Sequence, residues 1–141
     1  VGSEMCIRDR AGISQIFIAP ARASEETLRA VSDNSSGYIY ALSRHGVTGA
    51  DKEAETGGLD TVVDAIKRFD GAPVLLGFGI SEPEHVRAAL AAGADGAITG
   101  SAITRIIAGR VNSTEQGNEF TLAELADEVS GYVARMKAAT R

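Results

Sequence analysis

The stretch PVLLGFGISEPEHVRAALAAGADGAITGSAI, residues Pro73–Ile103, decides the fold because it contains two consecutive strand–helix units. Its apolar runs at 73–78 and 95–99 predict short strands, and the residues between them have the spacing and end signals of a helix. A further short helix is predicted from Ser101 to about residue 108. Strands that alternate with helices imply a parallel sheet with right-handed crossovers.

The helix between these two strands has a defined start signal. Ser81 and Glu84 have the spacing of a capping box, in which the serine side chain accepts from the third helical amide and the glutamate bonds back. Gly93 is placed as the stop signal of the same helix. The sequence therefore predicts a helix that begins directly after Ser81.

Two similar units precede this stretch. The runs 16–19 and 38–42 predict strands, while 25–33 and 59–69 predict helices, the first of them capped by Ser24. All four predicted strands are near-continuous apolar runs, which is typical of strands buried on both faces. The chain is thus predicted to contain four β/α units of an α/β fold.

The C-terminal part is predicted to be a polar linker over 111–120 and then a long helix. Thr121 and Glu124 form a second capping box at the start of that helix. Apolar residues recur along it at spacings of three and four, which indicates one packed face. This stripe consists of Leu122, Leu125, Val129, Tyr132 and Met136.

The composition limits the class of protein. The 141 residues are 44% hydrophobic, which is enough for one domain with its own core. A net charge of −5, with four Phe, three Tyr and no Trp, argues against a nucleic-acid partner. No apolar run approaches the ~18 residues of a membrane span, so we expect no membrane and a cytoplasmic protein. The single Cys6 excludes an internal disulfide and a thiolate metal cage.

The first ten residues, VGSEMCIRDR (Val1–Arg10), have no periodicity that continues into the next strand. They resemble a translated sequencing adapter, so we predict a non-native leader over 1–10 and one domain over 11–141. A short native arm remains the alternative.

Glycines at two successive strand ends predict an anion site. Gly77-Phe78-Gly79 follows one strand and Thr99-Gly100-Ser101 follows the next. In the second segment Gly100 and Ser101 begin a helix. Glycine lets backbone N–H groups approach an anion, and a helix N-terminus favours phosphate. In (β/α)₈ barrels the phosphate site is usually built by the loops after the last two strands and a short helix. We therefore predict the C-terminal half of a TIM barrel, four β/α units plus a C-terminal helix, rather than a small doubly wound domain.

The segments GYIYALSRHGVTGA (Gly37–Ala50), PVLLGFGISEPEHV (Pro73–Val86) and ADGAITGSAI (Ala94–Ile103) closely resemble the tryptophan synthase α-subunit family. The resemblance implies a lyase of tryptophan biosynthesis that cleaves indole-3-glycerol phosphate to indole and glyceraldehyde 3-phosphate. It implies a retro-aldol reaction without cofactor or metal, and a hetero-oligomer with a β subunit.

The resemblance also assigns residues. The positions that bind the substrate phosphate are Gly49, Gly79, Gly100 and Ser101. Tyr40 and Phe78 match the indole pocket. Arg44 begins a glycine-rich lid over 44–58, in which Thr48 helps to position a catalytic carboxylate.

The two carboxylates that act as acid and base in this family lie in the N-terminal half of the barrel. The resemblance therefore implies no catalytic residue in this chain, which we expect to be an inactive fragment when alone. We also expect its two open sheet edges to pair with other copies.

Two alternatives stay open at this point. One is another phosphate-binding barrel, such as one acting on a ribulose or thiamine phosphate, although such barrels need not contain SRHGVTG after this strand. The other is a non-catalytic half-barrel module that binds a phosphorylated ligand or a partner.

Overall fold

The predicted alternation of strands and helices is present in the computed structural model, which describes residues 10–42, 59–77, 79–115 and 119–141. The four strands form one parallel sheet in the order β1-β2-β3-β4. The elements are β1 (Ile18–Ala19), α2 (Glu25–Asn34), β2 (Ile39–Ala41), α3 (Leu59–Arg68), β3 (Val74–Leu76), α4 (Pro83–Ala91), β4 (Gly96–Ala97), α5 (Ser101–Glu115) and α6 (Leu122–Ala138).

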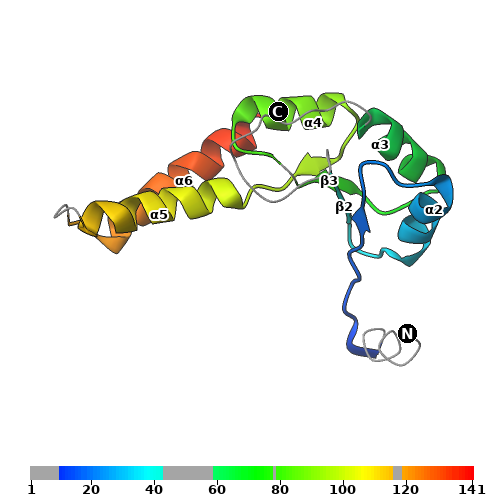
Figure 1. The fold of residues 1–141 in the computed structure, drawn as a ribbon, viewed down its shortest axis with the longest axis horizontal. Helices are drawn as coiled ribbons and strands as arrows, with labels where there is room; N and C mark the ends of the chain where they lie inside the picture. The colour runs from blue at the N-terminus through cyan, green and yellow to red at the C-terminus, as the bar shows by residue number, and fades with distance from the viewer. Residues whose placement is uncertain (1–9, 43–58, 78, 116–118) are drawn as a thin grey trace.

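One face of the sheet forms the core. The strand register aligns Ala19, Ala41, Leu76 and Ala97 in one row across the sheet. The first three of these are fully buried, as are Ile39 and Val74 on the same face. Figure 1 shows α2, α3 and α4 lying along this sheet, and buried residues from all three helices belong to the same hydrophobic cluster. The helices therefore cover one side of the sheet.

The opposite face of the sheet is less covered. Its row consists of Ile18, Tyr40, Leu75 and Gly96, of which Ile18 is 56% exposed and the other three are half-buried. The expectation of strands buried on both faces is therefore wrong for the described residues. The physical reason is that inward side chains of a barrel pack against those of strands on the other side of the barrel axis.

We expect the 141-residue chain to self-associate through this face and the outer edges of β1 and β4, which pair with no further strand among the described residues. Ile18→Lys places a charge on the exposed row and should shift the molar mass, measured by light scattering after size exclusion, towards the 14.6 kDa monomer. Leu122→Lys is the matched control, because Leu122 is 83% exposed on α6. A wild-type chain that is monomeric and unfolds in one cooperative step would contradict this expectation.

Local signals place the start of α2 as predicted, but not that of α4. The Ser24 hydroxyl accepts from the Thr27 amide at 3.2 Å and caps α2. In α4 the N-cap is Glu82 and the helix begins at Pro83, so the predicted Ser81–Glu84 box is wrong by one residue. Proline fits the first helical position because it has no amide hydrogen to satisfy there. His85 Nδ1, rather than Glu84, accepts from the Ser81 amide at 3.2 Å.

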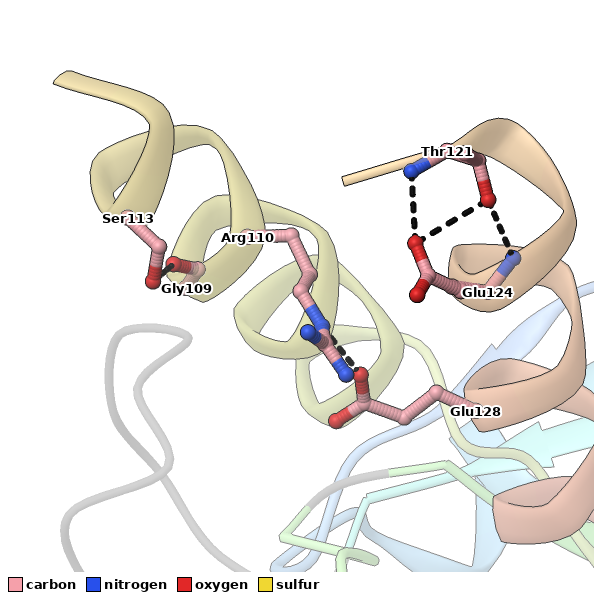
Figure 2. Close-up of polar contacts among 6 residues, drawn as sticks. All are labelled: Gly109, Arg110, Ser113, Thr121, Glu124 and Glu128. Atoms are coloured by element: carbon pink, nitrogen blue, oxygen red, sulfur yellow. Dashed lines mark hydrogen bonds and ion pairs between the residues drawn. The ribbon is translucent and has the colours of Figure 1, made fainter. Parts of the chain in front are cut away.

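The helix α5 is longer than predicted. It continues to Glu115, so the expectation of a polar linker from residue 111 is wrong. Figure 1 shows α5 and α6 running side by side away from the sheet. Arg110 Nε donates to Glu128 Oε2 at 2.6 Å and joins the two helices, while the Ser113 hydroxyl bonds back to Gly109 O at 2.9 Å (Figure 2). The ion pair to α6 thus lies in the part of α5 that the sequence prediction left out.

The predicted capping box of α6 is confirmed. The Glu124 amide donates to Thr121 Oγ1 at 3.2 Å, and the Thr121 amide donates to Glu124 Oε2 at 2.7 Å (Figure 2). The bond from the Thr121 amide, followed by that from its hydroxyl, lowers the pKa of the Glu124 carboxyl. Of the predicted stripe, Tyr132 and Met136 are buried whereas Leu122 is exposed. The helix therefore packs mainly through its C-terminal half.

Thr121→Ala should destabilise the protein by about 1 kcal/mol at pH 7, measured by urea denaturation, because it removes the side-chain cap of α6. The folded state lowers the pKa of the Glu124 carboxyl. The stability that the charged carboxylate contributes is therefore present above the ordinary carboxyl pKa of 4.5 and is lost as the pH falls through the lowered value. The cost of the substitution should therefore shrink in acid. If Thr121→Ala lowers the free energy of unfolding by the same amount in acid as at pH 7, the Glu124 carboxylate has no role in the cap.

Candidate phosphate-binding site

The loop after β3 turns at a glycine that is needed for its conformation. Gly79 has φ +76° and is half-buried. A positive φ in this range is strained for residues with a Cβ, so the turn favours glycine. The backbone of this loop can thus come close to a ligand without an intervening side chain.

The first amides of α5 have no acceptor within their own helix. The first helical hydrogen bond runs from the Thr104 amide to Gly100 O at 3.1 Å. The amides of Ser101, Ala102 and Ile103 therefore have no acceptor within their own helix. Gly100 and Ser101 are exposed, and a Cβ on Gly100 would meet no atom of the described residues within 4 Å. Amides not bonded within their helix, the space around Gly100 among the described residues, and the positive end of the helix dipole together favour an anion here.

The two loops lie next to each other. The Ile98 amide donates to Leu76 O at 2.7 Å, which aligns the ends of β4 and β3. Beyond them, Thr99 Oγ1 donates to Ile80 O at 2.9 Å. Because Ile80 follows Gly79 and Thr99 precedes Gly100, this bond brings the two glycine-bearing loops together. The structure thus joins three of the four predicted phosphate positions, Gly79, Gly100 and Ser101, at one edge of the sheet.

Tyr40 lies beside this edge on the half-covered face of the sheet. Its hydroxyl donates to Gly77 O at 2.5 Å, at the end of β3. Burial, and then the neighbouring Tyr38, raise the pKa of the Tyr40 hydroxyl, so it stays protonated and remains a donor at neutral pH. An aromatic ring held next to the glycine loop is consistent with the predicted pocket position.

Four predicted site residues lie outside the described residues, and their positions stay predictions: Arg44, Thr48, Gly49 and Phe78. Two residues that were not predicted as site residues, Thr99 and Tyr132, contact the described loops directly. Within the described ranges no group of three His, Cys, Asp or Glu side chains could hold a metal ion. Over the same ranges no helix has the length and apolar character needed to span a bilayer.

The family model "Tryptophan synthase alpha chain" matches residues 4–137. The chain belongs to the tryptophan synthase alpha chain family. The tryptophan synthase alpha chain of Corynebacterium aurimucosum is 59% identical over 133 residues, which cover 94% of this chain and 47% of that relative. A Haemophilus influenzae tryptophan synthase alpha chain is 46% identical over 130 residues, covering 92% and 46%. The chain spans about half the length of these curated relatives.

Solved structures of the family have the same fold. A chain from the tryptophan synthase α2β2 complex of Pyrococcus furiosus matches with a TM-score of 0.74 and 28% identity, covering 97% of this chain and 50% of that one. A mutant tryptophan synthase α-subunit from the same organism matches with a TM-score of 0.70 and 26% identity, covering 94% and 48%. These α-subunits of tryptophan synthase are TIM barrels, so the predicted half-barrel fold is confirmed.

Proposed function

We propose that this chain forms the phosphate-binding half of a tryptophan synthase α subunit, a lyase that cleaves indole-3-glycerol phosphate to indole and glyceraldehyde 3-phosphate. The observation that carries the proposal is the adjacency of the Gly79 loop and the N-terminus of α5, joined by the bond from Thr99 to Ile80. Both loops follow successive parallel strands, where barrels of this type bind phosphate.

The contribution of this half is binding and orientation. The amides of Gly79, Gly100 and Ser101 would hold the phosphate, with Gly49 as a further proposed contact. Tyr40 and Phe78 would contact the indole ring. With the phosphate fixed at one end and the indole at the other, the bond to be broken is held in one place, which lowers the entropic part of the barrier.

The chemical step needs groups beyond these. In the retro-aldol cleavage, the bond between indole C3 and the glycerol carbon breaks, C3 gains a proton, and the adjacent hydroxyl loses one to become the aldehyde. General acid and base groups typically contribute about 10²–10⁴-fold each to such steps. We propose that carboxylates of the other barrel half supply them, and that Arg44 and Thr48 of the lid help to position one of them.

The proposed protein partner is a tryptophan synthase β subunit. The support for this is that the matched Pyrococcus furiosus structure is described as a tryptophan synthase α2β2 complex. The acidic surface charge, with a net charge of −5, does not favour a nucleic-acid partner.

The proposal is tested by measuring indole release from indole-3-glycerol phosphate. We expect no detectable turnover by the 141-residue chain alone. We expect measurable turnover when it is mixed with the N-terminal half of the Corynebacterium aurimucosum relative. That relative is 59% identical to this chain over the 133 residues that the two share. Turnover by the chain alone would contradict the placement of the acid and base in the other half.

The same assay separates the alternative of a non-catalytic module. A chain that binds a phosphate ester yet gives no turnover with any N-terminal half would favour that module. The observation on its side is that the phosphate loops are formed by the described residues without the other half.

A further inference from the structure

The hydroxyl of Tyr132 lies between the two loops of the candidate site. Tyr132 is only 7% exposed and comes from α6, more than thirty residues after either loop. Its hydroxyl lies 2.7 Å from Thr99 Oγ1 and donates to Ser81 O at 3.1 Å. Thr99 Oγ1 in turn donates to Ile80 O at 2.9 Å. The hydroxyl of one buried tyrosine therefore lies within hydrogen-bond distance of the residue before Gly100 and of the loop after Gly79.

The number of protons limits how these bonds form. Tyr132 and Thr99 have one hydroxyl hydrogen each, but the network contains three short contacts. Two protons can serve two of these three contacts at a time, which gives three arrangements. The tyrosine donates to the threonine and the threonine to Ile80 O; or the threonine donates to the tyrosine and the tyrosine to Ser81 O; or the threonine donates to Ile80 O while the tyrosine donates to Ser81 O. In the first two arrangements the hydroxyls are bonded to each other and one carbonyl of the Gly79 loop is bound. In the third, both carbonyls are bound, Ile80 O by Thr99 and Ser81 O by Tyr132. The two loops are therefore connected in all three arrangements, either through Thr99 to Ile80 O or through Tyr132 to Ser81 O.

We propose that Tyr132, acting through Thr99, is a positioning residue that fixes the distance between the two phosphate-binding loops. This inference rests on the proposed phosphate site. Neither residue donates to the phosphate itself. The hydroxyl pair instead sets where the amides of Gly79, Gly100 and Ser101 stand relative to each other.

The spacing between these loops matters because the proposed donors are backbone amides. An N–H donor must lie ~2.7–3.2 Å from a phosphate oxygen, and a backbone amide has no rotamer that could compensate for a displaced loop. Donors from two separate loops therefore bind one phosphate well only when the loops are held in register. The Ile80, Ser81 and Thr99 backbone is the part of the chain that the hydroxyl network holds, directly beside Gly79 and Gly100.

A role limited to packing predicts a different result. The Tyr132 ring belongs to the hydrophobic core together with Met136 and Ala102. Tyr132→Phe keeps that ring and removes only the hydroxyl. If the side chain only packs, the substitution changes stability and leaves phosphate affinity unchanged.

The experiment is a calorimetric titration of the 141-residue chain with glycerol 3-phosphate, with the thermal midpoint of each variant measured in parallel. Tyr132→Phe and Thr99→Val should each raise Kd by about three- to tenfold, the size of one lost hydrogen bond. Thr99→Ser keeps the hydroxyl and should bind like the wild type. Tyr38→Phe is the matched control, because the Tyr38 hydroxyl has no hydrogen bond to other described residues.

The outcomes separate this inference from the proposed function. Wild-type affinity in Tyr132→Phe and Thr99→Val overturns the positioning role and leaves the phosphate site in place. If Tyr132→Phe does not fold, the contrast between Thr99→Val and Thr99→Ser decides, since equal affinities of these two overturn the inference. No binding of glycerol 3-phosphate by the wild-type chain overturns the proposed site and this inference together.

Discussion

Gly100→Asp is expected to weaken binding of glycerol 3-phosphate by about 100-fold or more without destabilising the fold. A carboxylate ~4 Å from the phosphate repels it by roughly 4 kcal/mol per unit charge near a protein surface. Gly100 stands at the N-cap position of α5, as its carbonyl accepts from Thr104. A Cβ there meets no atom of the residues that the structure describes within 4 Å. Aspartate is a favoured N-cap residue, so stability should stay the same or rise by a few tenths of a kcal/mol.

The control for this substitution lies in the same helix. Gly109→Asp makes the same change of charge in α5, also with open space around the new Cβ. Nine residues of helix separate the two positions by about 13.5 Å, which exceeds the ~8 Å Debye length at physiological salt. Gly109→Asp should therefore bind like the wild type. Equal affinities for the two variants would remove the N-terminus of α5 from the site.

Gly77→Ala is expected to destabilise the protein by about 2–4 kcal/mol, the sum of overpacking and one lost hydrogen bond. A Cβ on Gly77 would fall within the Tyr40 ring, closest to its Cζ, hydroxyl and Cε2 atoms. The ring must leave its position, and its hydroxyl bond to Gly77 O is lost. Urea denaturation measures the free energy of unfolding, and the same displacement should raise KM for indole-3-glycerol phosphate in the completed subunit.

Tyr40→Ala provides the partner for a double-mutant cycle. In the Tyr40→Ala background, Gly77→Ala should change the free energy of unfolding little, because the Tyr40 ring atoms that the new Cβ would meet are absent. A coupling energy of about 2 kcal/mol is therefore expected. Gly109→Ala is the control for the change of residue type, since its Cβ has free space within a helix and should be neutral or stabilising. Equal costs of Gly77→Ala in both backgrounds would contradict the contact with Tyr40.

Local signals in the sequence were sufficient for much of the fold. Ser24 and Thr121 cap their helices as predicted, because an N-cap depends on residues within one turn. The prediction failed where distant residues decide. The end of α5 lies at Glu115 rather than near residue 108, and the bond from Arg110 to Glu128 joins positions eighteen residues apart. No periodicity within α5 could have indicated that contact.

The candidate site shows the same division. Gly79 and Gly100 could be predicted as site residues from the sequence, because glycine at a strand end indicates a positive φ or the start of a helix, and both features are present. Tyr132 was predicted only as one apolar position of a helical stripe. Its ring fits the spacing of that stripe, but the spacing does not indicate which partners its hydroxyl binds. Its partner carbonyl on Ser81 is fifty-one residues away along the chain.

The loop at Gly79 and the N-terminus of α5 are proposed to bind one phosphate together. The most direct test is an NMR titration of the ¹⁵N-labelled chain with glycerol 3-phosphate, following the amide signals of Gly79, Gly100 and Ser101. We expect these amides to shift together with a single dissociation constant, while the amide of Gly109 does not move. Shifts confined to one loop, or different dissociation constants for the two loops, would contradict a shared phosphate site.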